Sequence, residues 1–219
     1  SSRFWRPEQL FVSRDGTQVI AVIPNEVGDE INTNVIVAKT ADLTDQRASL
    51  VSSLDTSFGA TLTDDRLLIV PELSGQVILF DPVRRVSSTD PIAVLSSLRL
   101  YRPLYIGGGR TIIGSGLDAG VFVVDEQGAD FGVSHPGRGA EQSVFALGPY
   151  DQDTFLAVGA EIDVDGRKAV ATLFDGKQLR FRPGVWPIGQ GIATDIVQRA
   201  GRTFVLLPWI GQVAVLERR

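Results

Sequence analysis

A strand–turn–strand pattern recurs five times along this chain of 219 residues. In each copy, two short runs rich in Val, Ile, Leu and Phe flank a polar turn, which is the pattern of a β-hairpin. The pairs of runs are residues 17–26 and 34–40, 66–72 and 76–82, 110–116 and 120–126, 154–161 and 168–174, and 202–209 and 211–217. Self-similarity at a period of about 20–50 residues is typical of solenoids, propellers and other repeat arrays. The sequence therefore predicts a series of similar β units.

The polar turn before each first run gives the period of the repeat. The landmark residues are Asp15, Asp64, Gly108, Gln152 and Gly201, which are spaced by 49, 44, 44 and 49 residues. Further apolar segments before and after the hairpins allow each repeat to be interpreted as four short strands. Four strands in about 40–45 residues match one blade of a propeller.

The segments SRDGTQVIAVIP, GQVILFDP and GVFVVDEQG resemble the repeats of β-propeller proteins of the YVTN and WD types, and this resemblance spans the whole chain. The chain departs from the WD class proper, because no Trp-Asp pair ends a second run and no Gly-His pair opens a repeat. The resemblance implies an all-β fold: a five-bladed β-propeller of four-stranded antiparallel blades, with residues 1–219 as a single domain. Propellers serve as enzymes, lectins and scaffolds, so the fold does not assign a function.

The two ends of the chain predict how such a ring would close. The fifth repeat stops after its second run, and the N-terminal segment SSRFWRPE resembles QLRFRPGV, the fourth strand of the fourth repeat. We therefore expect residues 2–6 to pair with the last repeat as its outermost strand, which would cover an open sheet edge. Because Ser1 is not a natural start, we expect a mature form or a domain excised from a longer protein.

Composition limits the partners. The net charge of -5 argues against nucleic acid, because phosphate binding needs a basic field. Cysteine is absent, which excludes disulfides, a thiol nucleophile and thiolate metal sites. No segment approaches about 18 consecutive apolar residues, so no transmembrane helix is expected. The composition suits the cytoplasm or an oxidising compartment, and we favour a periplasmic or extracellular location.

Acidic residues recur after the first run of the hairpins. Glu26, Glu72, Asp118 and Glu161 fall at or next to equivalent positions, and Trp209 takes that place in the fifth repeat. The resemblance to propellers implies that these loops lie on one face, around the mouth of the channel. A ring of carboxylates there would suit a cation, an amine or sugar hydroxyls. The alternative is that they are solvated turn residues, because carboxylates are mostly exposed and turns favour Asp.

A second recurring feature is a cationic or titratable residue directly before a proline. Arg6, Arg102, His135 and Arg182 occupy this position at the corners between repeats. Proline and the residue before it favour extended geometry, which suits a corner between strands. Convergent arginines would bind a carboxylate or phosphate. Alternatively, each arginine serves its own repeat by stacking on an aromatic ring or by capping strand carbonyls.

Signals of catalysis are few. His135 is the only histidine, so no site with two histidine ligands can form. The predicted inner strands contain only Glu8 and Asp195 as acids, which does not match a glycosidase centre. Trp186 and Trp209 in predicted loops suit sugar stacking or a protein contact. We therefore expect a non-catalytic binding or scaffold module that recognises a protein or a glycan, with no cofactor or metal. The alternative is a small propeller hydrolase that uses the loop carboxylates.

Overall fold

The computed structural model describes residues 3–4, 9–27, 30–52, 57–71, 75–88, 90–95, 100–115, 120–125, 127–128, 130–134, 142–163 and 166–217. In this part of the chain, no helix is long and apolar enough to cross a membrane. The chain separates into two compact units, which are described one at a time. The first comprises residues 1–111 with 125–129, and the second comprises residues 112–124 with 130–219.

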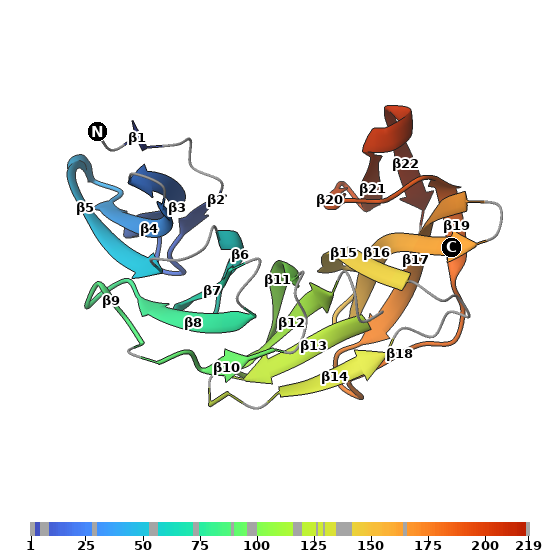
Figure 1. The fold of residues 1–219 in the computed structure, drawn as a ribbon, viewed down its shortest axis with the longest axis horizontal. Coiled ribbons are helices and arrows are strands. Elements are labelled where there is room, and N and C mark those ends of the chain that lie inside the picture. The colour runs from blue at the N-terminus through green and yellow to red at the C-terminus, as the bar shows by residue number, and fades with distance from the viewer. Residues whose placement is uncertain are drawn as a thin grey trace. The chain divides into compact units, whose positions relative to one another are not determined.

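The first unit begins with two antiparallel sheets (Figure 1). The strands of the first sheet are β1 (Arg3–Phe4), β2 (Gln9–Val12), β3 (Gln18–Val27), β4 (Glu30–Lys39) and β5 (Asp42–Ser52). Those of the second sheet are β6 (Ser57–Leu62), β7 (Leu67–Pro71), β8 (Gln76–Asp81), β9 (Val86–Ser87) and β10 (Ala93–Val94). Both β1 and β2 pair with β3, and both β9 and β10 pair with β8.

The third sheet has the order β11-β12-β13-β14, and the division between the two units falls within it. Its strands are β11 (Leu100–Gly107), β12 (Arg110–Ser115), β13 (Gly120–Asp125) and β14 (Asp130–Ser134).

The second unit continues with the fourth and fifth sheets. The strands of the fourth are β15 (Gln142–Pro149), β16 (Thr154–Asp163), β17 (Gly166–Asp175), β18 (Arg180–Phe181) and β19 (Trp186–Gln190). The fifth has β20 (Asp195–Arg199), β21 (Arg202–Leu207) and β22 (Gln212–Glu217), with the short 3-10 helix η1 (Pro208–Ile210) between β21 and β22. Both β18 and β19 pair with β17.

The predicted all-β fold and its five hairpins are confirmed. The hairpins are β3–β4, β7–β8, β12–β13, β16–β17 and β21–β22, and each is extended by a strand on the side of its first strand. An outer strand follows the hairpin in the first four sheets, and it is split into two short segments in the second and fourth. The fifth sheet has three strands among the described residues.

The expectation that residues 2–6 add a strand to the last sheet is wrong for the residues that the structure describes. Strand β1 pairs instead with β3 of the first sheet, with Arg3 opposite Glu26 and Phe4 opposite Asn25. The reason is the length of the first hairpin, whose register continues to Val27 opposite Glu30. Because β2 pairs only with residues 19–22, the far end of β3 offers an edge that β1 occupies.

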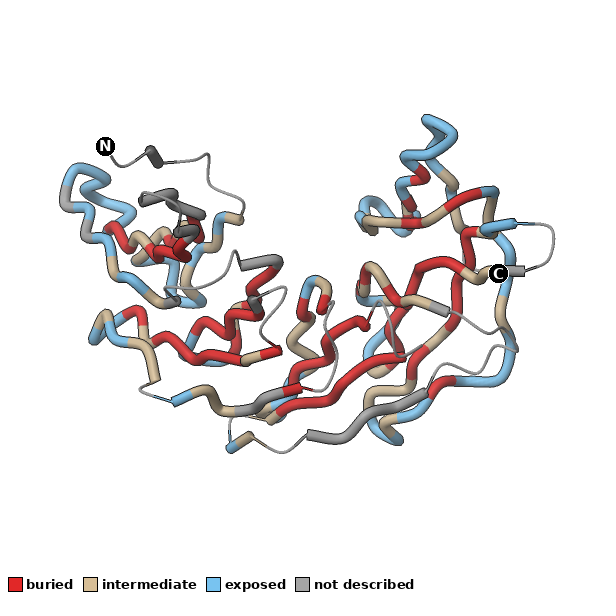
Figure 2. Tube along the Cα trace, in the orientation of Figure 1, coloured by how far each residue is buried: buried red, intermediate tan, exposed pale blue. Residues whose placement is uncertain are grey.

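Each unit has its own apolar core between neighbouring sheets. In the first unit, Ile20 and Val35 of the first sheet pack in one buried cluster with Leu67 and Phe80 of the second. Figure 2 shows buried residues along the central strands of these sheets. Burial of one large aliphatic or aromatic side chain contributes about 1.5–3 kcal/mol relative to exposure. These contacts between sheets are therefore a main source of stability.

The second unit repeats this arrangement. Leu156 and Ala171 of the fourth sheet share a buried cluster with Val205 and Leu207 of the fifth. The fourth sheet is covered on both faces at its centre, because four consecutive residues of β17, Ala169 to Thr172, are buried. The fifth sheet differs, since burial alternates along β21 and β22.

Aspartates at the end of the second hairpin strand fix the turn that follows. In the second sheet, Oδ1 of Asp81 accepts hydrogen bonds from the N–H groups two and three residues on, at 2.9 and 2.8 Å. In the fourth sheet, Oδ1 of Asp175 does the same at 3.0 and 2.9 Å. Such side-chain bonds stabilise a turn. As a result, the chain returns to pair with the strand it has just left, through β9 and β18.

We expect the substitution Leu67→Ala to lower the free energy of unfolding by about 2–5 kcal/mol, because it leaves a cavity in the core of the first unit. Leu67 is 0% exposed, whereas Leu43 of the same unit is 54% exposed. The matched control Leu43→Ala should change stability by about 0.5 kcal/mol or less. Urea denaturation followed by circular dichroism measures both, and equal losses would contradict the assigned core.

Candidate functional site

The loop acids predicted from the sequence lie within long hairpin strands where the structure describes them. Glu161 is in β16, opposite Gln142 of β15 and Lys168 of β17. Glu26 is in β3, and only its backbone is described. Glu72 and Asp118 lie outside the described residues. No group of three or more His, Asp or Glu side chains that could hold a metal ion is found in the described part of the chain.

Of the residues that precede proline, Arg102 and Arg182 are described, and Arg6 and His135 lie outside the described residues. Arg102 is exposed in β11, and the proline that follows it is buried. Here β11 lies close to β6, since a methyl group at Gly59 would be 2.9 Å from Cα of Arg102. This close approach is typical of packing between repeats.

Arg182 is held by its own sheet. Its Nη2 donates a hydrogen bond to Oγ1 of Thr154 at 2.7 Å and lies 3.6 Å from Oδ2 of Asp175. Its backbone N–H donates to the carbonyl of Leu173 at 2.8 Å. These contacts favour the interpretation in which this arginine serves the repeat.

The same corner perturbs an aspartate. Hydrogen bonds from the backbone N–H groups of Gln178 and Lys177, together with the positive charge of Arg182, hold the pKa of Asp175 below its ordinary value, and burial opposes them. Because the folded-state pKa is depressed, ionised Asp175 stabilises the fold at neutral pH. This stabilisation is lost as the pH falls through the folded-state pKa.

Asp175→Asn should therefore lower stability at pH 7, and its difference from wild type should shrink as the pH falls through the depressed folded-state pKa of Asp175, where the wild-type carboxylate takes up its proton. Urea unfolding of both proteins between neutral and acidic pH measures this. Asp65→Asn removes the same charge from an exposed position and serves as the control. If the stability difference between Asp175→Asn and wild type instead grows at acidic pH, the prediction is wrong.

An exposed tryptophan lies in the turn between β21 and β22. Trp209 is 61% exposed and belongs to η1. The guanidinium carbon of Arg167, at the start of β17, lies 5.3 Å from the centroid of its ring. This distance is within the range of a cation–π interaction. The ring is therefore partly ordered although most of it faces solvent.

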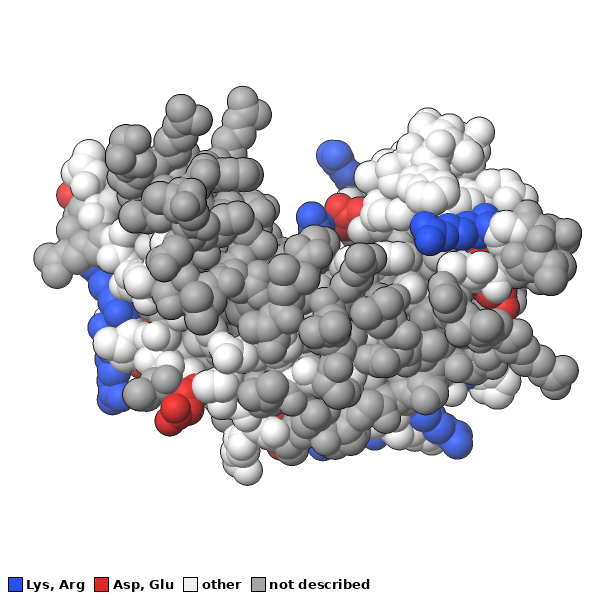
Figure 3. All heavy atoms as spheres, in the orientation of Figure 1, with Lys and Arg blue, Asp and Glu red and all other residues white. Residues whose placement is uncertain are grey.

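Backbone packing positions this turn. Gly191 has a φ of 86°, and a methyl group on it would be 2.9 Å from Cβ of Trp209. Its N–H donates a hydrogen bond to the carbonyl of Arg167 at 2.9 Å. Ile210, next to Trp209, is also exposed. We call Arg167, Trp209 and Ile210 the Trp209 surface. In Figure 3 the atoms over η1 are uncharged, and cationic atoms lie nearby on the same face.

Trp186 does not join this surface. It is 45% exposed and opens β19, where it pairs with Ala171. Gln190, which precedes Gly191, is at the other end of β19, roughly 13 Å away for four residues of extended strand. The structure therefore places Trp186 at one end of β19 and Trp209 beside Gly191, which follows the other end. The sequence did not predict Arg167 as a partner of Trp209, because 42 residues separate them.

A separate pocket of 230 Å³ lies on the second sheet, in the first unit. Two arginines, one aspartate, two serines and three aliphatic residues line it. None of the residues singled out from the sequence is among them. Sequence patterns did not reveal it, because it forms where an outer strand is interrupted.

No protein-family model matches the chain. No curated protein sequence matches it either. Among solved structures it is similar to the β-propeller domain of Cps50 (Swd1) from Myceliophteria thermophila, with a TM-score of 0.65, 13% identity, and coverage of 97% of this chain and 73% of that chain. It is also similar to hydrazine synthase from Kuenenia stuttgartiensis, with a TM-score of 0.63, 13% identity, and coverage of 96% of this chain and 66% of that chain. For the WD40 domain of coronin from Toxoplasma gondii, the TM-score is 0.54 and the identity 12%, with coverage of 94% of this chain and 69% of that chain.

The fold is that of a β-propeller repeat protein. This conclusion rests on the sheets of antiparallel strands together with the likeness to these structures, and at 10–13% identity the likeness shows the fold alone. The chain spans 66% of the hydrazine synthase chain and 60% of a Bacteroides thetaiotaomicron protein of unknown function, so it corresponds to less than two thirds of either.

Proposed function

We propose that this propeller is a non-catalytic binding module that recognises another protein through the Trp209 surface. The observation that carries the proposal is the exposed ring of Trp209 beside the guanidinium of Arg167. Tryptophan and arginine are among the residue types that are enriched at the hot spots of protein interfaces. The adjacent exposed Ile210 adds apolar area to the same turn.

Pre-organisation supports the same proposal. An aromatic side chain has few rotatable bonds, so its immobilisation costs little entropy on binding. In the second unit, the contact with Gly191 and the cation–π pair restrict the ring further. The surface is therefore poised to contact a partner with little rearrangement. A glycan that stacks on the open face of the ring is the other candidate ligand.

The alternative from the sequence is a small hydrolase that uses Glu26, Glu72, Asp118 or Glu161. A glycosidase centre needs two carboxylates about 5–9.5 Å apart. Glu161 is the one member of this set whose side chain is described, and its neighbour across the strand pair is Lys168. Among the described side chains, this set therefore supplies one carboxylate, whereas such a centre needs two. Turnover of a glycoside that Glu161→Gln abolishes would favour the hydrolase.

We expect Trp209→Ala to weaken binding of the partner by about tenfold or more, as is typical of an interface hot spot. Pull-down of interacting proteins and a glycan array, each followed by affinity measurement for the recovered ligand, provide the readout. Trp186→Ala is the matched control, because it removes an equally large exposed ring at the far end of β19. If Trp209→Ala binds every recovered ligand as wild type does, the site assignment fails. A ligand recovered only on the glycan array, and lost with Trp209, would make the partner a glycan.

We also propose that the five sheets are blades of one closed ring. The support lies in the fifth sheet, whose outward face carries exposed Val197, Leu206, Val213 and Val215. Val215 pairs with Phe204, and Phe204 in turn pairs with Val197, so one apolar row crosses all three strands. In a closed ring every sheet has a neighbour on both faces, and this row would be covered.

If the ring is closed, Val215→Asp should lower the free energy of unfolding by about 2 kcal/mol or more, because it buries an unpaired charge. Val83→Asp adds the same charge at a position that is 75% exposed and should cost about 0.5 kcal/mol or less. Urea denaturation at two protein concentrations measures both losses and separates ring closure from self-association. Similar losses for the two variants would show that the face of the fifth sheet stays open.

A further inference from the structure

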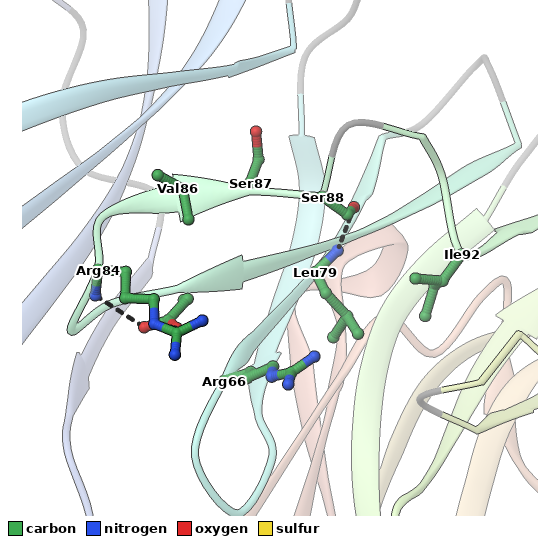
Figure 4. A pocket seen from close by; sticks show the side chains of 8 residues that line it. Arg66, Leu79, Arg84, Val86, Ser87, Ser88 and Ile92 are labelled. Carbon is green, nitrogen blue, oxygen red and sulfur yellow. Dashed lines mark hydrogen bonds and ion pairs between the residues drawn. The ribbon is translucent and has the colours of Figure 1, made fainter.

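The pocket on the second sheet lies beside the middle of β8 (Figure 4). Strand β9 pairs with β8 only at Phe80 and Asp81, and β10 pairs with it only at Gln76 and Val77. Between these two segments the outer strand is interrupted. Leu79 therefore lies at the floor of the pocket, with Ser88 at its edge.

The fourth sheet shows what closes this corner in another repeat. Asp175 pairs with Arg180 there, as Asp81 pairs with Val86 in the second sheet. The N–H of Arg182 donates to Leu173, as the N–H of Ser88 donates to Leu79, so Arg182 and Ser88 are equivalent.

In the fourth sheet, the long side chain of Arg182 reaches across to Thr154 and Asp175. In the second sheet, the short side chain of Ser88 leaves the corresponding space open. Arg66 occupies in the second sheet the position that Thr154 occupies in the fourth. Thr154 opens β16 and Arg66 directly precedes β7, and each of these strands pairs with the strand that ends at the aspartate. The two repeats share the backbone of this corner but differ in the side chains there, and this difference leaves the pocket in the second sheet.

The charge of the pocket is positive. Arg66 and Arg84 line it, and Asp81 is the one acid among the lining residues. One oxygen of Asp81 already accepts two backbone N–H groups, and the other lies 3.8 Å from Nε of Arg84. Nε of Arg66 lies 4.0 Å from the carboxylate of Asp65, which is a long contact. Among the contacts with described residues, guanidinium N–H groups therefore remain that can bind an anion.

The floor and walls are aliphatic. Leu79, Val86 and Ile92 line the pocket, and Figure 4 shows Leu79 between Arg66 and Ser88. Guanidinium groups bind carboxylates in a planar, two-pronged geometry. A carboxylate with an aliphatic stem would satisfy the arginines and cover the apolar floor together, whereas inorganic phosphate would satisfy only the arginines.

We propose that this pocket binds an aliphatic carboxylate of a peptide, supplied by an internal glutamate or by a free C-terminus. The site is in the first unit and independent of the Trp209 surface, so it goes beyond the function proposed above. With either source, the carboxylate would bind the two arginines at the mouth of the pocket, and its aliphatic stem would lie on Leu79.

The experiment titrates the 219-residue chain with four probes and follows the N–H signals of residues 84–90 and Ile92 by NMR. The probes are hexanoate, a blocked peptide with one internal glutamate between two leucines, a neutral leucine-rich peptide with a free C-terminus, and inorganic phosphate. We expect saturable shifts with hexanoate and with at least one peptide. The peptide that binds identifies the source of the carboxylate.

Two kinds of variant test the pocket. Arg66→Gln with Arg84→Gln removes the charge, and we expect it to weaken binding about tenfold or more, since it deletes charge-assisted hydrogen bonds. Ser88→Leu fills the space without changing charge and should weaken binding to a similar degree. A long side chain is compatible with this position, because Arg182 occupies the equivalent one. Arg199→Gln with Arg202→Gln removes the same charge elsewhere and should leave binding unchanged.

The absence of saturable shifts with every carboxylate probe would overturn the proposal. So would affinity unchanged by both pocket variants, or tighter binding of phosphate than of hexanoate. An equal loss in the control pair would also overturn it, because binding would then reflect only the overall charge.

Discussion

The apolar character of both faces of each hairpin is the constraint on which the rest of this structure depends. In β8 the four residues Val77 to Phe80 are buried in succession, and in β17 the same holds for Ala169 to Thr172. A strand of this kind needs a cover on each face, because side chains alternate between the two faces. Packing of sheet on sheet meets that need within each unit, through the buried clusters around Leu67 and Val205. Strand β22 has a similarly apolar sequence but alternating burial, with Val213 and Val215 exposed.

This constraint explains why the hairpins were predictable from sequence. An apolar run, a polar turn and a second apolar run are local features, and the five observed hairpins follow the five predicted ones. The outer strands were less predictable, because their pairing depends on turn geometry. Asp81 and Asp175 each bond the following backbone and return the chain to the end of the strand that they close. After that short pairing the chain leaves the strand and pairs with it again further along. No apolar pattern in the sequence predicts this second pairing.

The incorrect prediction for the N-terminus has the same origin. The likeness between SSRFWRPE and QLRFRPGV indicated an outer strand, but an isolated short strand carries no information about which edge it joins. The edge was decided by the extension of β3 and β4 to Val27 and Glu30, beyond the apolar runs that define the repeat. The sequence predicted only part of the Trp209 surface, for a related reason. Exposure of an aromatic residue in a turn is a local inference, whereas its contact with Arg167 depends on how β17, β19 and η1 come together.

Both candidate sites lie where a repeat departs from the common pattern. The corner that Arg182 fills in the fourth sheet is open in the second because Ser88 is short. A 3-10 turn that presents Trp209 connects the last hairpin, whereas the hairpin of the fourth sheet ends with Asp163 paired to Gly166. The buried positions of a repeat are restricted by the need to cover both faces, and corners and turns are restricted only by the backbone path. Recognition residues can therefore differ from repeat to repeat at these positions without disturbing the core, which is how one β scaffold carries unrelated binding functions.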